Sequence, residues 1–229
     1  MITYILDLKN YKFNFNHYLL NNISQQRKDN LLKYKNDIDK NLSLYSELLV
    51  KMSIASLCNI DISKIILSKT TTGKPICKYP KNIYFNFSHT RSSILLSISK
   101  SKYLGVDIEK IKNAPFDIVK SVFNHKEINF LHRYHKYSKN YNFFYIWTRK
   151  EAYLKSIGIG LVENLNNINI LDKKYNNNFH TFTYNNYICS IYSKNINVKN
   201  NKIIIITKKE VDDFYKNHQL PDNALINLW

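Results

Sequence analysis

Two acidic residues lie two positions apart in a short apolar run, Gly105-Val106-Asp107-Ile108-Glu109. The alternation of apolar and acidic residues predicts a β-strand. Because side chains of a strand alternate between its faces, Asp107 and Glu109 leave the same face. Two carboxylates about 5 Å apart repel each other by roughly 3 kcal/mol at an effective dielectric constant near 20. A metal ion or basic cluster would turn this repulsion into a binding site, whereas water would screen it on a solvent-facing strand.

A third carboxylate lies in an aromatic segment. Trp147, Glu151 and Lys155 are spaced four residues apart, so they share one side of a helix that we expect over residues 141–157. Trp147 and Leu154 place the Glu151 carboxylate along the apolar stripe, where an unpaired charge is costly. The carboxylate either has a functional partner or forms an ordinary surface ion pair with Lys155.

The elements that must position these residues follow from periodicity and turn signals. Ser43 is expected to cap a helix, Thr70–Pro75 to form a turn, and the three strands between residues 83 and 109 to be neighbours in one sheet. The expected helices cover residues 43–58, 118–123, 124–134, 141–157 and 208–216, and the expected strands cover residues 83–87, 94–99, 105–109, 167–171, 179–184, 187–193 and 202–207. Helices interleaved with strands that can form hairpins indicate α+β architecture.

Composition limits the class of protein. With 229 residues and 44% hydrophobic residues, the chain can build a core without disulfides or metal, and its three cysteines lack zinc-site spacing. We expect a cytoplasmic protein, because no leader sequence or membrane-spanning run is evident. The net charge of +17 favours an anionic partner, which could be a nucleic acid, a lipid, a phosphorylated cofactor or an acidic protein.

Four motifs occur in a characteristic order. They are Gly73-Lys74-Pro75, then Phe87-Ser88-His89, then Gly105 to Glu109, and finally Trp147-x-x-Lys150-Glu151-Ala152-x-x-Lys155. In this order they resemble the 4′-phosphopantetheinyl transferase superfamily. The chain length is similar to that of the Sfp-type branch, whose members are single-chain pseudodimers.

The resemblance implies an α+β fold of two similar halves, related by a pseudo-twofold axis, with the active site between them. We place the N-terminal half, with the coenzyme A nucleotide contacts, at residues 1–103. The C-terminal half, with the metal and catalytic residues, is placed at residues 104–229. A monomer is expected.

The resemblance also implies a role for each acidic residue. Asp107, Glu109 and Glu151 would coordinate Mg²⁺ shared with the diphosphate of coenzyme A, which suits the preference of magnesium for a few carboxylates completed by phosphate and water oxygens. Glu127 falls where relatives carry another acidic residue near the metal, but its spacing from Asn124 also fits a capping box. Glu151 would accept the proton of the attacking serine, and Lys155 would stabilise the leaving phosphate.

Other residues match positions that contact coenzyme A in the family. Ser88 and His89 would meet its phosphates, as would the side chains of Lys74, Lys150 and Lys155.

The N-terminal nucleotide contacts depart from the family pattern. Ser43 stands where relatives carry threonine after a basic residue, and here Leu42 precedes it. Lys33, Lys35 and Lys40 lie upstream, and any of the three could meet the 3′-phosphate; Lys33 is included among the expected site residues. The position after His89-Thr90, often glycine in relatives, is Arg91.

The implied reaction moves 4′-phosphopantetheine from coenzyme A to a serine of an acyl or peptidyl carrier protein and releases adenosine 3′,5′-bisphosphate. Carriers of this kind are typically acidic, which suits the basic chain, and they belong to fatty-acid, antibiotic or other secondary-metabolite biosynthesis. Neither nucleic acid nor membrane is an expected partner. The alternatives are a basic nucleic-acid-binding protein or another Mg²⁺-dependent enzyme that cleaves phosphodiesters.

Overall fold

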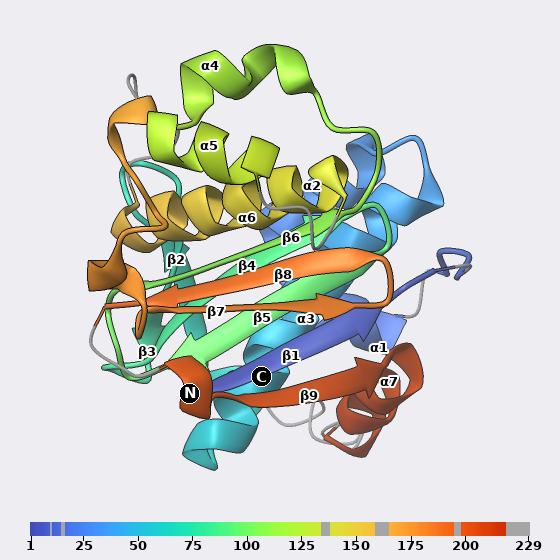
Figure 1. Ribbon diagram of the computed structural model, residues 1–229. Coiled ribbons are helices and arrows are strands. Elements are labelled where there is room, and N and C mark those ends of the chain that lie inside the picture. Colours follow the sequence, from blue (N-terminus) through green and yellow to red (C-terminus); the bar gives the residue numbers. More distant parts are fainter. Residues whose placement is uncertain (10, 15–16, 134–137, 159–164, 195–197, 219–229) are drawn as a thin grey trace, which may run out of the picture.

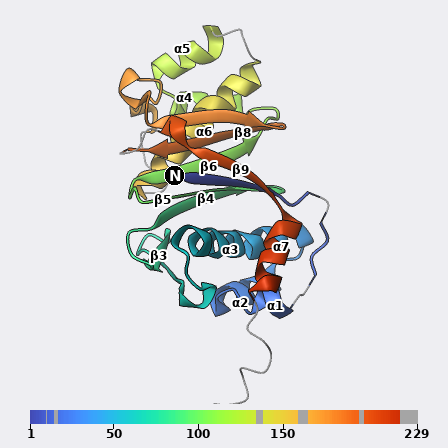
Figure 2. The same ribbon diagram turned by 90° about the horizontal axis from the view of Figure 1, so that it is seen from below.

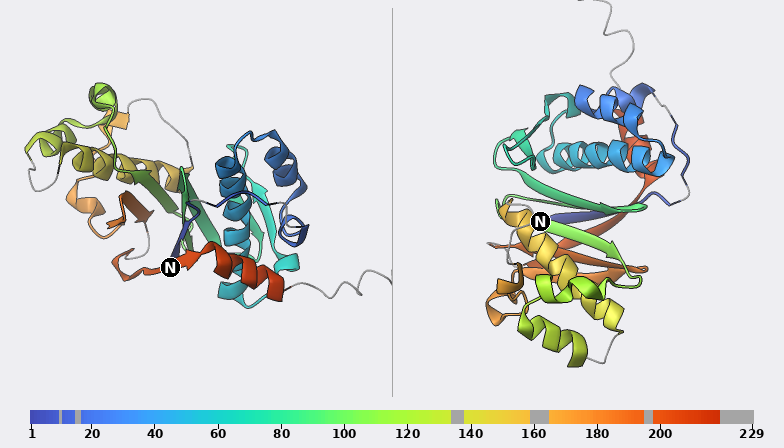
Figure 3. Two further views of the ribbon diagram at one scale, coloured as in Figure 1. Left: turned by 90° about the vertical axis from the view of Figure 1, so that its right-hand side faces the viewer. Right: turned by 90° about the horizontal axis from the view of Figure 1, so that it is seen from above.

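The computed structural model describes residues 1–9, 11–14, 17–133, 138–158, 165–194 and 198–218. Within them, nine strands form sheets of four, three and two strands. Figure 1 and the right-hand view of Figure 3 show the two larger sheets stacked face to face, with helices on both outer sides. The α+β class expected from the sequence is confirmed.

The four-stranded sheet has the order β4-β5-β1-β9. Strand β4 (Tyr84–Thr90) and strand β5 (Ser93–Ser99) form a hairpin, and β5 also pairs antiparallel with β1 (Ile2–Asp7). Strand β9 (Lys202–Thr207) pairs in parallel with β1, so the first and the last strand of the described chain lie side by side in one sheet.

One face of this sheet packs against the long helix α3 (Asp37–Cys58). Helices α1 (His17–Leu20), α2 (Gln25–Lys33) and α7 (Lys208–Asn217) surround α3, as Figure 2 shows. The C-terminal elements β9 and α7 therefore belong to the same layers as the N-terminal segment. The division at residues 103 and 104 and the pseudo-twofold relation stay predictions.

Helix α3 begins six residues before its expected start at Ser43. The side chain of Asn36 accepts a hydrogen bond from the Asp39 amide, and Asp37 and Asp39 carry negative charge in the first turn, where it stabilises a helix. Ser43 is therefore a buried residue inside the helix rather than its cap.

A two-stranded hairpin leads from the short 3-10 helix η1 (Ile62–Lys64) back to the main sheet. Its strands are β2 (Ile66–Lys69) and β3 (Pro75–Tyr79), and the expected turn joins them. Gly73 in this turn has a φ of +81°, which glycine adopts without steric cost.

The three-stranded sheet has the order β6-β8-β7. Strands β7 (Phe179–Tyr184), β8 (Tyr187–Ser193) and β9 have the bounds expected from the sequence. Strand β6 (Leu104–Lys110) pairs with β8 and not with β4 or β5, so the expectation of one sheet for the strands between residues 83 and 109 was wrong. Val106 and Ile108 instead pack against Ile5 and Leu95 of the other sheet.

Helix α6 (Lys139–Ile157) covers the outer face of β6 and β8 and ends at Gly158, as predicted. Beside it lie α5 (His125–Arg133), α4 (Val119–Val122) and the 3-10 turn η2 (Phe116–Ile118). The other 3-10 turns are η3 (Leu165–Asn167), η4 (Lys173–Tyr175) and η5 (Val198–Asn200). The strand expected over residues 167–171 was wrong, because this stretch begins at the last residue of η3 and continues through irregular backbone into a turn. No helix in the described ranges is long and apolar enough to span a bilayer.

Candidate functional site

Strand β6 and helix α6 touch through their backbones at Gly105. A Cβ atom on Gly105 would lie 1.9 Å from the carbonyl oxygen of Ala152 and 2.6 Å from the amide nitrogen of Ser156. No side chain fits into such a contact. Because alternate residues of a strand share a face, Asp107 and Glu109 lie on the same face of β6 as Gly105, towards α6. The glycine thus lets β6 lie directly against the helix that carries Glu151 and Lys155.

Asp107 is the buried centre of this junction, with 4% of its surface exposed. Its Oδ1 accepts hydrogen bonds from Ser88 Oγ at 2.8 Å and from Lys155 Nζ at 2.6 Å. Lys155 Nζ also donates to Ser88 Oγ at 2.9 Å. These three predicted site residues come from β6, β4 and α6, so three distant segments meet at one carboxylate.

Asp107 Oδ2 is buried and has no hydrogen-bond partner among the residues that the structure describes. Leaving a carboxylate oxygen without a partner away from water costs free energy, and such an atom calls for an explanation. A hard cation, which prefers oxygen ligands, would give Asp107 Oδ2 a partner.

Glu109 and Glu151 lie close enough to Asp107 to repel it. Burial, followed by the charge of Asp107, raises the pKa of Glu109 to about 7. Burial and then Asp107 also raise the pKa of Glu151, while Lys155 opposes this rise. The chemistry of these donors fits a divalent cation, which would relieve the repulsion. Among the residues that the structure describes, however, no three acidic, His or Cys side chains are grouped closely enough to hold a metal ion.

Glu127 and Lys150 form a separate, fully buried ion pair. Lys150 Nζ lies 2.8 Å from Glu127 Oε2, and both side chains are 0% exposed. Lys150 Nζ also donates to the carbonyl oxygens of Leu165 at 3.0 Å and Ile168 at 2.6 Å. The expectation that Lys150 contacts a phosphate therefore disagrees with the structure, because its ammonium group is enclosed and already has three acceptors.

The Glu127 carboxylate is fully occupied as well. It accepts hydrogen bonds from the amides of Asn124 at 2.7 Å and Ile170 at 2.8 Å in addition to Lys150. The helix-capping alternative is thus the one that the structure favours. A role of Glu127 as a metal ligand beside Asp107 does not agree with these contacts.

A polar groove lies on the other side of β4, between α2, α3 and the β2–β3 hairpin. It has a volume of about 610 Å³ and continues into a smaller hollow of about 220 Å³ at His89. Ser43 lines both parts, as predicted for a nucleotide contact. Lys33 lies exposed at the end of α2 and is not among the residues that line either part.

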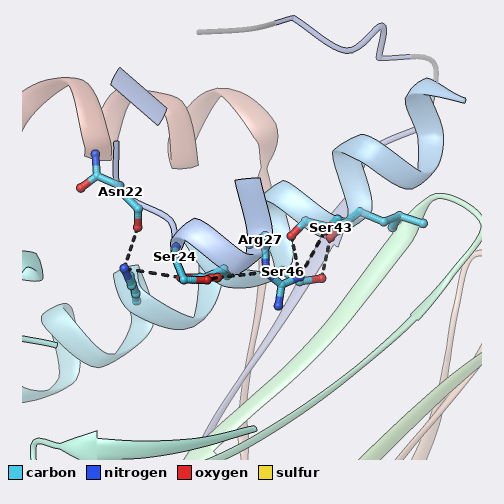
Figure 4. Close-up of polar contacts among 8 residues, drawn as sticks. Asn22, Ser24, Arg27, Ser43 and Ser46 are labelled. Atoms are coloured by element: carbon cyan, nitrogen blue, oxygen red, sulfur yellow. Dashed lines mark hydrogen bonds and ion pairs between the residues drawn. The ribbon is translucent and has the colours of Figure 1, made fainter. Parts of the chain in front are cut away.

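Arg27 of α2, rather than Lys33, lines both parts of the groove. Its Nε donates to Glu47 Oε2 at 2.9 Å, and its Nη1 donates to the Ser43 carbonyl oxygen at 2.9 Å. Figure 4 shows Arg27 between Ser24 and Ser43. This arginine was not predicted from the sequence, although the acidic Glu47 inside an apolar helix pattern indicates that α3 needs a basic partner.

His89 lies exposed at the rim of the smaller hollow. Removal of water by the surrounding groove lowers its pKa, and the charge of Lys155 lowers the pKa further. The imidazole is therefore neutral at pH 7 and faces cationic neighbours. Arg27 lines the hollow with His89 and the acidic Asp39. An anion bound there would be attracted by the charge of Arg27 and could accept a hydrogen bond from the His89 ring.

Lys74 lies at the opposite end of the site and does not point into the groove. Its Nζ donates to the carbonyl oxygens of Lys155 at 2.5 Å and Ser156 at 3.2 Å. The predicted phosphate contact of Lys74 stays untested, but here the ammonium group is bound to the end of α6.

Two family models match adjoining stretches of the chain. One, described as the 4′-phosphopantetheinyl transferase superfamily, matches residues 103–212, and the other, the N-terminal region of 4′-phosphopantetheinyl transferase, matches residues 9–101. This chain belongs to the 4′-phosphopantetheinyl transferase superfamily.

Individual relatives place the chain with the Sfp-type members of this superfamily. The 4′-phosphopantetheinyl transferase gsp of Aneurinibacillus migulanus is 32% identical over 155 residues, which are 68% of this chain and 63% of that protein. Sfp of Bacillus subtilis (strain 168) is 28% identical over 139 residues, covering 61% and 62% of the two chains. The L-aminoadipate-semialdehyde dehydrogenase-phosphopantetheinyl transferase of Mus musculus is 28% identical over 156 residues, covering 62% and 50%. The matched part thus spans less than two thirds of each of these relatives.

Proposed function

We propose that the chain transfers 4′-phosphopantetheine from coenzyme A to a serine of an apo acyl or peptidyl carrier protein. The serine oxygen forms a bond to the β-phosphorus, the bond from that phosphorus to the bridging oxygen breaks, and adenosine 3′,5′-bisphosphate leaves. The observation that carries the proposal is the meeting of Ser88, Asp107 and Lys155 from three segments, beside the carboxylates of Glu109 and Glu151.

Glu151 is the proposed proton acceptor. Its raised pKa makes the carboxylate a stronger base than an ordinary glutamate, and a base must carry a pKa suited to the proton that it takes. Lys155 is the proposed donor to the leaving phosphate, because its ammonium group already points into the junction, where it would stabilise developing negative charge.

Asp107, Glu109 and Glu151 are the proposed ligands of Mg²⁺. When bound, the ion would neutralise phosphate charge and hold the diphosphate in place. The unpaired Oδ2 of Asp107 and the raised pKa of Glu109 support this assignment, since both are unfavourable without a cation. Glu127 is left out of the proposed ligand set.

Coenzyme A is proposed to place its nucleotide in the groove between α2, α3 and β4. Arg27, Ser43 and His89 line the part of the groove that would meet phosphate. The net charge of +17 suits both the polyanionic cofactor and an acidic carrier, which it would attract from solution. A cytoplasmic monomer that activates carriers of secondary-metabolite biosynthesis is the setting that we propose.

Incubation of the protein with coenzyme A, Mg²⁺ and an apo carrier tests the proposal. We expect the carrier mass to rise by one phosphopantetheine group, and only when coenzyme A is present. Cleavage of phosphodiesters without coenzyme A would instead identify another Mg²⁺-dependent enzyme, and salt-sensitive binding of nucleic acid alone would identify a binding protein. Rates on a fatty-acid, a polyketide and a nonribosomal-peptide carrier would show which is preferred.

A further inference from the structure

The last turn of α6 has carbonyl oxygens that no intrahelical amide can satisfy, as at the end of every α-helix. The amide of Gly158, whose φ is +75°, donates to the Leu154 carbonyl oxygen at 2.9 Å and closes the helix. The carbonyl oxygens of Lys155, Ser156 and Gly158 obtain their hydrogen bonds from outside the helix. All three hydrogen bonds come from two side chains of the turn between β2 and β3.

The turn presents Lys74 in a fixed geometry. The Gly73 amide donates a hydrogen bond to the Thr70 carbonyl oxygen at 2.9 Å. The Thr70 amide donates to the Lys74 carbonyl oxygen, also at 2.9 Å. The Lys74 amide donates to Thr70 Oγ1 at 3.0 Å. The backbone of the turn is thus held by its own hydrogen bonds, independently of α6.

From this turn, two side chains reach the helix. Lys74 Nζ donates to the carbonyl oxygens of Lys155 at 2.5 Å and Ser156 at 3.2 Å, and Thr72 Oγ1 donates to that of Gly158 at 3.2 Å. The alkyl stem of Lys74 lies over Gly158, where an added Cβ would meet its Cδ at 3.4 Å. A cation bound to the last carbonyl groups also complements the negative end of the helix dipole.

Lys74 binds the backbone carbonyl oxygen of Lys155, and the side chain of Lys155 carries the ammonium group of the proposed active site. Lys155 Nζ reaches Asp107 Oδ1 at 2.6 Å and Ser88 Oγ at 2.9 Å. We propose that the β2–β3 turn is a clamp on the end of α6, in which Lys74 is a positioning residue that sets Lys155 against Asp107 and Ser88. This inference rests on the proposed transferase function, and it replaces the expected phosphate contact of Lys74.

The clamp and a phosphate contact lead to different results for Lys74→Met. If Lys74 positions Lys155, the variant keeps its affinity for adenosine 3′,5′-bisphosphate, and kcat falls roughly three- to tenfold with little change in KM for coenzyme A. Lys74→Arg, which retains the cation, should recover most of kcat. Thr72→Val is a milder variant that removes the second contact and should lower kcat less.

Lys78→Met is the matched control, because Lys78 is an exposed lysine on β3 of the same hairpin and its loss changes the net charge equally. Amide hydrogen exchange of the protein without ligand gives a second readout. Exchange at Ser156, Ile157 and Gly158 should be faster in Lys74→Met than in Lys78→Met, since the end of α6 has lost its clamp.

Two outcomes overturn the clamp. One is exchange at the end of α6 equal to that of the control, whatever the nucleotide affinity. The other is faster exchange with kcat unchanged, which would make the contact structural only. If the unmodified protein transfers no phosphopantetheine, the proposed function fails, and the exchange experiment alone still decides whether Lys74 and Thr72 hold the helix end.

Discussion

At the scale of single residues, Lys155 and Glu151 carry the most specific prediction. Lys155→Met and Glu151→Gln should each lower kcat by roughly 100-fold or more, because one removes charge stabilisation and the other removes the proton acceptor. Lys139→Met, at the exposed start of the same helix, is the matched control and should transfer at the normal rate. Turnover within twofold of normal in either active-site variant, measured by carrier mass, would remove that residue from its proposed role.

His89 gives a pH-dependent prediction. The groove around the exposed His89 ring removes part of its water, and this loss of solvation, followed by the charge of Lys155, lowers the pKa of His89. The folded state therefore binds this proton less readily than the unfolded chain does. This contribution to stability is present above about pH 6.5 and is lost as the pH falls through the lowered pKa. A phosphate beside the ring favours the imidazolium ion, so binding should reverse the shift.

NMR titration of the histidine ring signals checks this. We expect the His89 midpoint to lie below about 6.5 in the free protein and to rise when adenosine 3′,5′-bisphosphate is added. The His89→Gln variant identifies the signal. A midpoint that does not move with the nucleotide would place the phosphates elsewhere.

The buried pair of Glu127 and Lys150 predicts a change in stability. Glu127→Gln leaves the Lys150 ammonium group enclosed without its counter-charge, and breaking such a pair costs about 3 to 5 kcal/mol. The free energy of unfolding in urea measures this loss. Asp37→Asn, which affects a half-exposed pair with Lys40, should cost less than about 1 kcal/mol. Similar losses in both variants would mean that Lys150 finds water or another partner.

At the scale of elements, the contact of β6 with α6 depends on Gly105. Gly105→Ala must push the helix away from the strand, which should cost at least about 2 kcal/mol and lower kcat, because Glu151 and Lys155 move with the helix. Val106→Ala is the comparison variant. It faces the other sheet, so it should lose about 2 kcal/mol of stability with kcat unchanged well below its melting temperature. Equal kcat values for both variants would mean that the contact at Gly105 does not position Glu151 and Lys155.

The elements also show which parts of the fold the sequence could predict. Strands β7, β8 and β9 were predicted to the residue, because their alternation and bounding turns are local signals. The partner of β6 was not predicted, because β8 lies about 80 residues later in the chain. The short connection between β5 and β6 instead favoured the wrong prediction that these two strands are neighbours in one sheet. The start of α3 was not predicted, because the capping residue Asn36 lies in a polar stretch, where a polar cap does not stand out from its neighbours.

The candidate site divides in the same way. The motifs predicted that Ser88, Asp107 and Lys155 belong together, and the structure places their side chains in contact. The surroundings of Lys150 and Lys74 could not be predicted, because burial and the position of a helix end depend on tertiary packing. Arg27 was missed for the same reason, since its partner Glu47 lies on another helix.

At the scale of the whole molecule, the C-terminal helix tests whether the protein unfolds as one unit. Tyr215 of α7 is buried against α3, and its hydroxyl donates to the Leu48 carbonyl oxygen at 2.7 Å. Tyr215→Ala should cost about 3 to 5 kcal/mol, and Tyr215→Phe about 1 kcal/mol.

Trp147 lies in the core on the far side of the stacked sheets, so its fluorescence reports on a distant region. With Trp229 replaced by Phe, we expect Trp147 fluorescence and circular dichroism to show the same lowered midpoint in Tyr215→Ala, because both sheets share the core around Ile5 and Val106. Two separate transitions would show that the layers fold independently.

The pairing of β1 with β9 also has a consequence for synthesis of the protein on the ribosome. Strand β1 emerges first, but one of its two partners, β9, begins only at Lys202. At translation rates of about 5 to 20 residues per second, β1 waits roughly 10 to 40 s with one edge unpaired. During that interval the nascent chain offers an open strand edge, which is a template for pairing with another chain until β9 covers it.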